Sequence, residues 1–343
     1  MNFTLVSTVF NEVKRLPETI RDLEQQTLQP SEIIITDAGS TDGTYELLQQ
    51  WKKASAIPII ILQKSKCNVA EGRNMAIRAA HYDFIASTDF GCRFHPQWLE
   101  SIIAPFTNLS VEVVGGAFTV EEAQQNTLSA KAAYILSNGY RVDVAAPWFI
   151  PSSRSIAYKK YVFENIGGYC EWLTLATDDF IYGKEIQVKG YKVVMSDKPY
   201  VYWGRHKTAK GFIMESGRYG LGDGEAKVNF RNFASNFLHF ALRVLFVLWL
   251  VFLFVNIFFS GIHLLPALCL FILAIGFRPY IGYIKSWLKY RSAKYNSQVM
   301  LYGFYLLEAT RLQYIRSYIK GYFFASKHQK QEAKFLQQRL VKA

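Results

Sequence analysis

The sequence has few cysteines, and none of them are paired at a metal-binding spacing. Cys67, Cys92, Cys170 and Cys269 are the four cysteines in 343 residues, and they form no CxxC motif. This argues against a zinc site and a disulfide framework, and indicates reduced thiols in a cytosolic setting. The start, MNFTLVSTVFNE, lacks the basic segment and long apolar run of a signal peptide. We expect it to form a first β-strand.

Acidic residues are nearly absent from the last third of the chain. Residues 1–236 carry 25 Lys and Arg against 25 Asp and Glu, whereas residues 237–343 carry 14 against 2. A neutral N-terminal part is not typical of a nucleic-acid binder. A basic C-terminal part that is also apolar and aromatic favours contact with an anionic membrane surface. We therefore expect membrane lipids, and no nucleic acid, among the partners.

Charge is missing altogether from residues 244–277, a run of 34. One membrane-spanning helix needs about 20 apolar residues. The breaks at Ser260-Gly261 and Pro266 therefore predict two short transmembrane helices, a hairpin within residues 231–284. The alternative is a buried helical hairpin of a soluble protein. The turn between the helices has no basic residue and both flanks have several, which places both ends in the cytosol, at a plasma membrane or cell inner membrane.

Residues 285–343 are expected to form basic amphipathic helices and a tail. The segment 301–327 mixes Leu, Ile, Phe and Tyr with Arg and Lys, and it is too charged to span a membrane. It predicts a helix lying at the membrane interface. The alternative is an ordinary amphipathic helix packed on the protein. The final residues predict a solvated helix or a disordered tail.

Residues 1 to about 230 have the pattern of an α/β domain. Short apolar runs at 3–10, 32–38, 57–63 and 83–89 alternate with segments whose apolar positions have helical spacing. This alternation predicts βαβ units and a mostly parallel sheet flanked by helices. Ligands bind such sheets beyond the carboxyl ends of the strands.

Polar residues follow three of the predicted strands. Asn11 and Glu12 come after the first strand, TDAGSTDGT (36–44) after the second and Asp89 after the fourth. At one sheet edge they would form an acidic pocket suited to a cation, a base edge or sugar hydroxyls. Asp37 could accept a hydrogen bond from a nucleobase. Ser40 could reach a ribose, whereas Asp42 is better explained as a cap of the next helix.

Three further segments carry candidate residues. Arg73 follows a glycine at the start of a helix, a position suited to a diphosphate, although a solvated arginine is the alternative. Asp178 and Asp179 open another helix, where they could cap it or provide a general base. Arg205 and Lys210 could bind diphosphate, and nearby His206 could ligate a metal. The later GLGDG lacks the preceding strand and the spacing of a dinucleotide fingerprint.

Taken in order, STVFNE, ITDAGSTDGT, EGRNMAI, STDFGCRFHPQWL, ATDDF and RYGLGDGEA resemble the family 2 glycosyltransferases, which have the GT-A fold. The resemblance covers about residues 1–230, and the membrane tail is similar to that of bacterial members that build surface polysaccharides or glycolipids. It implies inverting transfer of a sugar from a nucleotide diphosphate sugar donor. A lipid-linked or saccharide acceptor, in exopolysaccharide, O-antigen or glycolipid synthesis, is expected.

The resemblance also implies roles for individual residues. Thr8 and Glu12 fall in the family's first nucleotide-binding turn, together with Asn11. Asp37 falls at the base-binding aspartate, near Ser40, and Arg73 in the helix facing the donor. Asp89 falls at the first carboxylate of the Asp-x-Asp metal motif, which implies Mg²⁺ or Mn²⁺. Asp179 falls at the catalytic base, beside the donor-site residue Asp178.

Two departures from the family pattern are visible. Gly91 stands where the second metal aspartate would be, and the Gln-x-x-Arg-Trp of processive synthases is absent; ESGRYG (215–220) occupies its approximate place. Addition of a single sugar is therefore expected. The alternative is a catalytically silent sugar-nucleotide-binding scaffold at a polysaccharide assembly site. If the metal motif functions with Asp89 alone, Gly91→Asp is expected to leave donor binding intact or tighten it.

Overall fold

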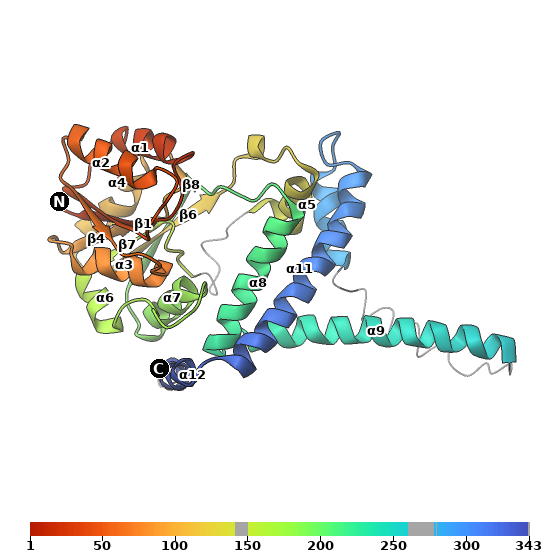
Figure 1. Cartoon of the computed structure of the whole chain (residues 1–343). Helices are drawn as coiled ribbons and strands as arrows, with labels where there is room; N and C mark the ends of the chain where they lie inside the picture. Colours follow the sequence, from red (N-terminus) through yellow and green to blue (C-terminus); the bar gives the residue numbers. More distant parts are fainter. Residues whose placement is uncertain (141–149, 260–277, 279, 342–343) are drawn as a thin grey trace. The chain divides into compact units, whose positions relative to one another are not determined.

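The computed structural model describes residues 1–140, 150–259, 278 and 280–341 (Figure 1). They fall into two compact units. Unit 1 contains Met1–Gln124, Tyr140–Arg205 and Ser326–Ala343, and unit 2 contains Gln125–Gly139 and His206–Ala325. The division at residues 230 and 284 into catalytic, membrane and basic C-terminal parts stays a prediction. Cys67, Cys92 and Cys170 are free, and Cys269 lies outside the described residues.

Unit 1 is built on one sheet of eight described strands, in the order β3-β2-β1-β4-β7-β6-β8-β5. The four strands β3-β2-β1-β4 are parallel, whereas β7 is antiparallel to both its neighbours and β5 is antiparallel to β8. The strands are β1 (Thr4–Val9), β2 (Glu32–Asp37), β3 (Ile59–Gln63), β4 (Phe84–Ser87), β5 (Arg93–Phe94), β6 (Val113–Thr119), β7 (Ile156–Lys159) and β8 (Val193–Tyr202).

The α/β class with flanking helices is confirmed, but the mostly parallel sheet is wrong in its second half. Parallel neighbours need a crossover connection, usually a helix. The regular alternation of strand and helix that implies such crossovers ends at β4. Beyond it, β6 and β8 are the one further parallel pair among the eight described strands, and the sheet is mixed.

Helices cover both faces of the sheet (Figure 1). Alternate side chains of β1 and β2 explain this, because Leu5, Ile33 and Ile35 enter one hydrophobic layer while Val6 and Ile34 enter the other. The first layer includes α1 (Leu16–Glu24), α2 (Thr44–Ala54) and α4 (Trp98–Ile103); the second includes α3 (Val69–Arg78), α6 (Lys160–Ile166) and α7 (Asp178–Val188). Short 3₁₀ turns occupy Ala104–Thr107, Glu122–Gln124 and Asn138–Tyr140.

The last helix, α12 (Lys327–Val341), belongs to unit 1 and packs against α7. Arg339 forms an ion pair of 3.0 Å with Glu185 of α7, whose side chain is only 2% exposed. Gln329 donates hydrogen bonds to the carbonyl of Trp172 and the hydroxyl of Thr174. The tail, predicted to be a solvated helix or disordered, is a helix, and it packs on unit 1.

Unit 2 is helical. It contains α5 (Leu128–Leu136), α8 (Ala209–Ala226), α9 (Phe230–Phe259), a helix over residues 280–290 and α11 (Ser297–Phe324). Helices α8 and α11 touch backbone to backbone. A Cβ added at Gly220 would lie 2.4 Å from the carbonyl oxygen of Tyr314, and one at Gly224 would lie 2.2 Å from that of Tyr318. The first and last glycines of GLGDG, Gly220 and Gly224, therefore serve close helix packing.

The segment predicted to lie at the membrane interface is α11, and one of its faces is buried within unit 2. Val299, Leu306 and Tyr318 lie in that buried face, whereas Leu301, Tyr305 and Phe323 are exposed. The alternative of a helix packed on the protein is thus correct for one side. Membrane contact through the exposed side stays a prediction.

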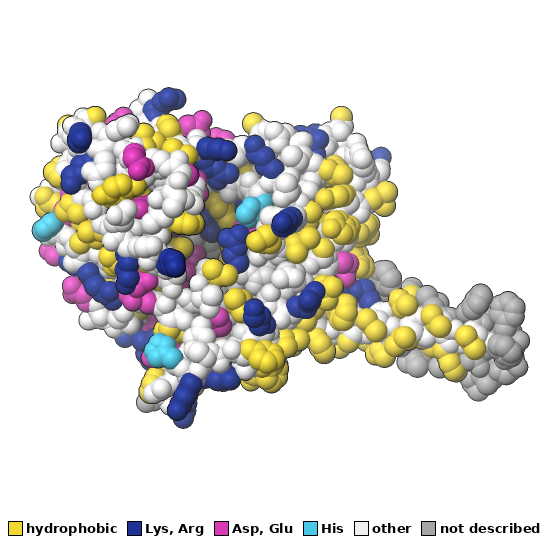
Figure 2. Space-filling view, viewed as in Figure 1, with side chains coloured by type: hydrophobic (Ala, Val, Ile, Leu, Met, Phe, Trp, Pro, Cys, Tyr) yellow, Lys and Arg dark blue, Asp and Glu magenta, His cyan; other side chains and the backbone are white. Residues whose placement is uncertain are grey.

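One described helix is long and apolar enough to cross a membrane: Phe230–Trp249, the first two-thirds of α9. None of this stretch is buried, unlike the core helix of a soluble domain. Apolar side chains cover most of the described surface of α9 in the space-filling view (Figure 2). The rest of the predicted hairpin, residues 260–277, lies outside the described residues.

Candidate active site

The first two strand-end turns are tied together by side chains. The backbone N–H of Asn11 donates to the Ser40 hydroxyl at 2.9 Å, and the Asn11 side-chain oxygen accepts from the backbone of Thr41 at 2.9 Å. Asp42 accepts from the backbone of Val13 and from both the backbone and hydroxyl of Thr44. Thr44 is the first residue of α2, so Asp42 accepts hydrogen bonds from the start of this helix, as its predicted role as a cap requires. The N-cap residue itself is Gly43, one position later than predicted.

Asp37 ends β2 and is fully buried. One of its carboxylate oxygens accepts from the backbone N–H groups of Gly39 and Ser40 at 3.2 and 3.1 Å, and from the Gln63 side chain at 3.4 Å. Gly39 has a φ of +87°, which only glycine adopts readily. Asp37 therefore fixes the shape of the second turn. Its contact with a nucleobase stays a prediction.

The start of α3 lies directly against β1. A Cβ at Gly72 would lie 2.8 Å from a methyl carbon of Thr8, so only glycine allows this approach. Asn68 caps the helix by accepting from the backbone of Glu71 at 2.8 Å. Because α3 approaches β1 so closely, the next residue, Arg73, lies near the carboxyl ends of the strands, where it contacts Asp89.

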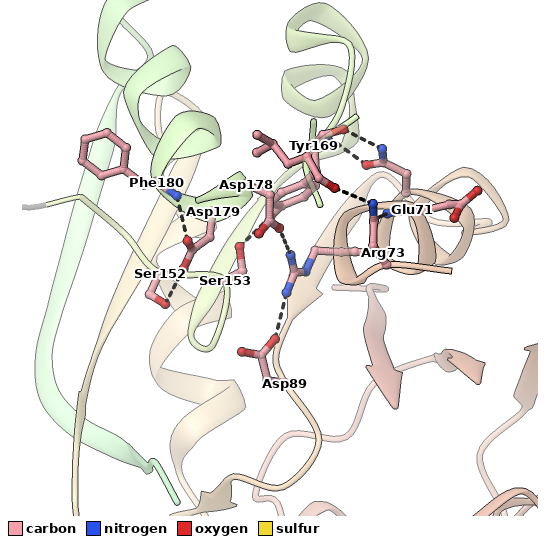
Figure 3. A network of polar contacts seen from close by, with 12 residues as sticks. Glu71, Arg73, Asp89, Ser152, Ser153, Tyr169, Asp178, Asp179 and Phe180 are labelled. Atoms are coloured by element: carbon pink, nitrogen blue, oxygen red, sulfur yellow. Dashed lines mark hydrogen bonds and ion pairs between the residues drawn. The ribbon is translucent and has the colours of Figure 1, made fainter. Parts of the chain in front are cut away.

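Arg73 joins two carboxylates from different elements (Figure 3). Its Nη1 donates to Asp178 Oδ2 and its Nη2 donates to Asp89 Oδ1, both at 2.8 Å. The guanidinium lies 4.7 Å from the ring centroid of Tyr169, and the side chain is 2% exposed. Both terminal nitrogens thus have carboxylate partners. The predicted contact with a diphosphate stays a prediction.

Asp178 and Asp179 are neighbours in sequence but differ in environment. Asp178 is buried against Arg73, whereas Asp179 is partly exposed. Burial raises the pKa of Asp178 to about 6; Arg73 opposes this, and the nearby carboxylates of Asp179 and Asp89 add to it. Asp179 Oδ1 accepts from the backbone of Phe180 at 2.8 Å, and Oδ2 accepts from the Ser152 hydroxyl at 3.3 Å (Figure 3).

Helix capping accounts for only part of this pair, because Asp179 accepts from the first-turn N–H of Phe180 whereas Asp178 accepts from Arg73. The N-cap of α7 is Thr177, whose side chain makes no capping hydrogen bond. Its φ of +81° is strained for a β-branched residue. Strained backbone of this kind is concentrated at functional sites, where surrounding contacts hold it. Here it turns the two carboxylates at the start of α7 towards different partners.

Arg154 and Ser152 are site residues that the sequence reasoning missed. Arg154 Nε lies 3.8 Å from Asp89 Oδ2, and its Nη1 donates to the Ser152 hydroxyl at 3.0 Å. Since that hydroxyl oxygen accepts from Arg154, its own hydrogen is directed to Asp179. A polar chain therefore runs from Asp89 through Arg154 and Ser152 to Asp179. The available signal was the polar run PSSRS immediately before the strand IAYK.

The indole ring of Trp203 contacts two arginines close to this row of polar side chains. Its ring centroid lies 3.9 Å from the Arg154 guanidinium carbon and 3.8 Å from that of Arg205. Two guanidinium groups cannot share one face at these distances, so they stack on opposite faces. Arg205 also donates to the Tyr140 hydroxyl at 3.1 Å. The predicted anion-binding residue Arg205 therefore lies within unit 1 and is held by aromatic rings.

Position 91 is occupied by glycine for a structural reason. Its φ is +98°, and a Cβ there would lie 3.2 Å from a carboxylate oxygen of Glu12. Burial raises the pKa of Glu12, Arg15 lowers it and Asp42 raises it. A new carboxylate at position 91 would be strained and would face Glu12, so Gly91→Asp carries a cost in stability; its effect on donor binding stays a prediction.

The residues around Asp89 fit a divalent cation through a single protein carboxylate. Asp89 is 35% exposed, and among the described residues the ion-pair contact of its Oδ2 is the one with Arg154, at 3.8 Å. No group of three His, Cys, Asp or Glu side chains forms a metal site among the described residues. Mg²⁺ and similar ions accept one or two carboxylates together with substrate phosphates and water. Such an ion would therefore depend on bound donor.

The remaining predicted residues lie in unit 2. His206 packs its ring edgewise on Phe212, with centroids 5.7 Å apart. Lys210 is exposed in the first turn of α8. Since both belong to a different compact unit from Asp89, the metal role of His206 and the anion-binding role of Lys210 stay predictions.

Comparison with known proteins decides the family of the sheet domain. Residues 4–167 match the model of Glycosyl transferase family 2. This stretch of the chain is a family 2 glycosyltransferase domain. The predicted resemblance is confirmed, and it now applies to the part of unit 1 that holds the strand-end turns, Arg73, Asp89 and Arg154.

Similar proteins come from bacteria and archaea. The chain is 29% identical over 203 residues to the O-antigen chain rhamnosyltransferase WbaN of Salmonella anatum, covering 56% of this chain and 62% of the relative. It is 25% identical over 187 residues to the glycosyltransferase AglE of Haloferax volcanii, covering 51% and 61%. The chain thus matches about three-fifths of the length of these relatives.

A solved structure shows the same fold. The mannosyltransferase PcManGT of Pyrobaculum calidifontis, in complex with GDP-Man and Mn²⁺, matches with a TM-score of 0.56 and 15% identity. The match covers 95% of this chain and 88% of that chain. At this identity the likeness concerns the fold alone.

Proposed function

We propose that this protein is an inverting glycosyltransferase that moves one sugar from a nucleotide diphosphate sugar to a lipid-linked or saccharide acceptor. The synthesis of O-antigen, exopolysaccharide or glycolipid at the cytosolic membrane face is the proposed setting. The rhamnosyltransferase relative acts on an O-antigen chain, which supports this substrate class. The family domain and the carboxylate arrangement at the start of α7 support the reaction.

The pair Asp178 and Asp179 carries the proposal. Inversion requires a single displacement at the anomeric carbon, with a carboxylate removing the proton of the acceptor hydroxyl. Asp179 is partly exposed and accepts from Ser152, so it is accessible and oriented. Asp178 is buried on Arg73 and suited to positioning. We assign the role of general base to Asp179. Asp178 is assigned the role of holding Arg73 in position.

The departing diphosphate gains negative charge, and cationic groups near Asp89 are suited to stabilise it. Arg154 and Arg205 are held on the faces of Trp203. Asp89 would hold a Mg²⁺ or Mn²⁺ ion together with the donor, and such an ion neutralises charge on phosphate oxygens when bound. The Mn²⁺ in the complex of PcManGT supports this choice of metal.

The apolar, unburied Phe230–Trp249 stretch supports a membrane location. The basic residues that flank residues 244–277 support cytosolic placement of the site. Membrane lipids are accordingly proposed as partners. Single-sugar addition rests on the absence of the Gln-x-x-Arg-Trp sequence.

The decisive experiment measures sugar transfer and donor hydrolysis by the purified full chain with a panel of nucleotide sugars and Mn²⁺. Asp179→Asn preserves shape but removes the base, and a loss of about 10²–10⁴-fold in kcat is expected. Asp83→Asn is the matched control, because Asp83 is exposed and precedes β4 at the opposite end of that strand.

Full activity of the Asp179→Asn protein would contradict the assignment of the base. Calorimetric measurement of nucleotide-sugar binding distinguishes the transferase from the alternative of a catalytically silent scaffold. Tight binding of a nucleotide sugar by the unaltered protein, without turnover across an acceptor panel, would favour a catalytically silent binding protein over the proposed transferase.

A further inference from the structure

Unit 2 contains a pocket of about 520 Å³ that plays no part in the candidate active site. It lies between the end of α5, the helix over residues 280–290 and α11. Its described lining residues are Leu136, Asn138, Gly282, Tyr283, Lys285, Ser286, Lys289, Leu307 and Arg311. The described lining is thus apolar on some sides and basic on others, and it includes no carboxylate.

The positive charges of the two lysines in this pocket are not neutralised by a described carboxylate. Lys285 and Lys289 are four residues apart, so they share one helix face, where like charges destabilise a helix. Neither forms an ion pair with a described residue, although Lys289 donates to the Asn138 side chain at 3.2 Å. Such an arrangement is favourable when an anion occupies the space between the charges.

A third cation lies deeper in the same pocket. Arg311 has a side chain that is 19% exposed and lies 3.6 Å from Glu308, which also pairs with Arg243 at 2.9 Å. One carboxylate thus serves two guanidinium groups. Burial lowers the pKa of Arg311, Glu308 opposes this and Arg243 lowers it further. The wall of the pocket therefore carries excess positive charge.

We propose that this pocket binds the phosphate group of a lipid, with Lys285, Lys289 and Arg311 as its ligands. An ammonium pair and a guanidinium match the charge and hydrogen-bonding capacity of a phosphate. The apolar residues Leu136 and Leu307 provide a surface for the adjoining hydrocarbon. The conclusion that the phosphate belongs to a lipid rests on the proposed membrane location of this unit. The conclusion that the pocket binds phosphate rests on its basic residues alone.

Two lipid sources share this chemistry: an isoprenoid phosphate, of the kind that carries sugars, and a bulk phospholipid. Lys285 and Lys289 follow the predicted membrane segment in sequence, and basic residues next to such a segment are typical of sites for phosphate head groups. Gly282 also leaves the pocket open, since a Cβ there would meet no atom within 4 Å. A larger side chain can therefore be introduced at this lining position while every charge is retained.

The test measures equilibrium binding to the purified full chain in a neutral detergent, with fluorescent farnesyl phosphate in one arm and fluorescent phosphatidylglycerol in the other. Lys285→Gln/Lys289→Gln is expected to weaken binding by about tenfold or more. Gly282→Leu should weaken it as well, because it introduces a larger side chain at a lining position. The matched control, Arg316→Gln/Lys320→Gln, removes two exposed charges of α11 outside the pocket and should bind as the unaltered protein does.

Selective loss in the farnesyl phosphate arm identifies an isoprenoid phosphate, and loss in the phosphatidylglycerol arm identifies a phospholipid. Equal binding by the pocket variants and the control overturns the proposal. So does an equal loss in the control, which would indicate general attraction. Full competition by inorganic phosphate at the same concentration would overturn the lipid assignment. Binding is measured without turnover, so failure of the proposed transferase activity would not alter these outcomes.

Discussion

Arg73 is the residue whose contacts hold the candidate site together. Its guanidinium bridges Asp89, which follows β4, and Asp178, which begins α7. Removing one partner of a buried ion pair leaves the other charge uncompensated, which costs about 3–5 kcal/mol. The site therefore depends on Arg73 for its assembly as well as for its charge.

At position 91 the backbone decides which residues are tolerated. We expect Gly91→Asp to lower the free energy of unfolding by about 1–3 kcal/mol, because an L-residue at a φ of +98° is strained. Gly91→Asn is the matched variant, because asparagine has the shape of aspartate and a similar tolerance of positive φ but no charge. Denaturant unfolding of both variants separates the two causes, and a larger loss for the aspartate measures its repulsion by Glu12. A Gly91→Asp protein as stable as the original would contradict the strain.

At the scale of elements, the packing of α8 on α11 is set by glycines. Gly224 lies so close to Tyr318 that a Cβ would be 2.2 Å from its carbonyl oxygen. A Cβ at Gly217 would instead meet the end of the flexible Gln313 side chain, at 2.8 Å. The two positions therefore differ in whether their neighbour can move away.

This difference gives a matched pair of variants. Gly224→Ala is expected to destabilise unit 2 by about 1–3 kcal/mol, because it forces the two helices apart. Gly217→Ala should be neutral or stabilise by up to about 1 kcal/mol, since alanine favours the helix. Thermal unfolding in detergent measures both. Equal effects of the two substitutions would show that the helices do not pack as closely as described.

At the scale of the whole molecule, the chain leaves unit 1 at Arg205 and returns to it at Ser326. The returning helix α12 covers Glu185 of α7, the helix that begins with Asp178 and the proposed base Asp179. Burial raises the pKa of Glu185, and Arg339 and Lys189 oppose this effect. The described end of the chain thus contributes to the surroundings of α7, which carries the proposed base.

We expect Arg339→Gln to lower the free energy of unfolding by about 1–3 kcal/mol, because it leaves the Glu185 carboxylate buried and without its cation. An acid with a raised pKa loses stability as pH rises, because the folded state binds its proton more tightly than the unfolded state does. The loss should therefore be larger at pH 8 than at pH 5. Lys334→Gln, an exposed charge on the same helix, is the control; a pH-independent loss would contradict the pairing.

The sequence by itself determined the sheet domain, its strand-end turns and the family. Strand and helix alternate from β1 to β4 with periods that local side-chain patterns make visible, and each polar turn follows its strand directly. Asp37, Ser40 and Asp89 could therefore be placed without coordinates. The glycine before Arg73 was also visible, but its purpose, the contact with Thr8, was not.

Only the tertiary structure decided what surrounds Asp89. Because β7 runs antiparallel to β4, with Ile156 opposite Ser87, the start of β7 lies at the carboxyl edge of β4. This brings Arg154 and Ser152 to the site, whereas an all-parallel sheet would place the residues before each strand at the opposite edge. The tertiary structure also decided that Asp178 is buried whereas Asp179 is partly exposed. Strand direction and burial arise from contacts between residues far apart in the chain, which no local pattern contains.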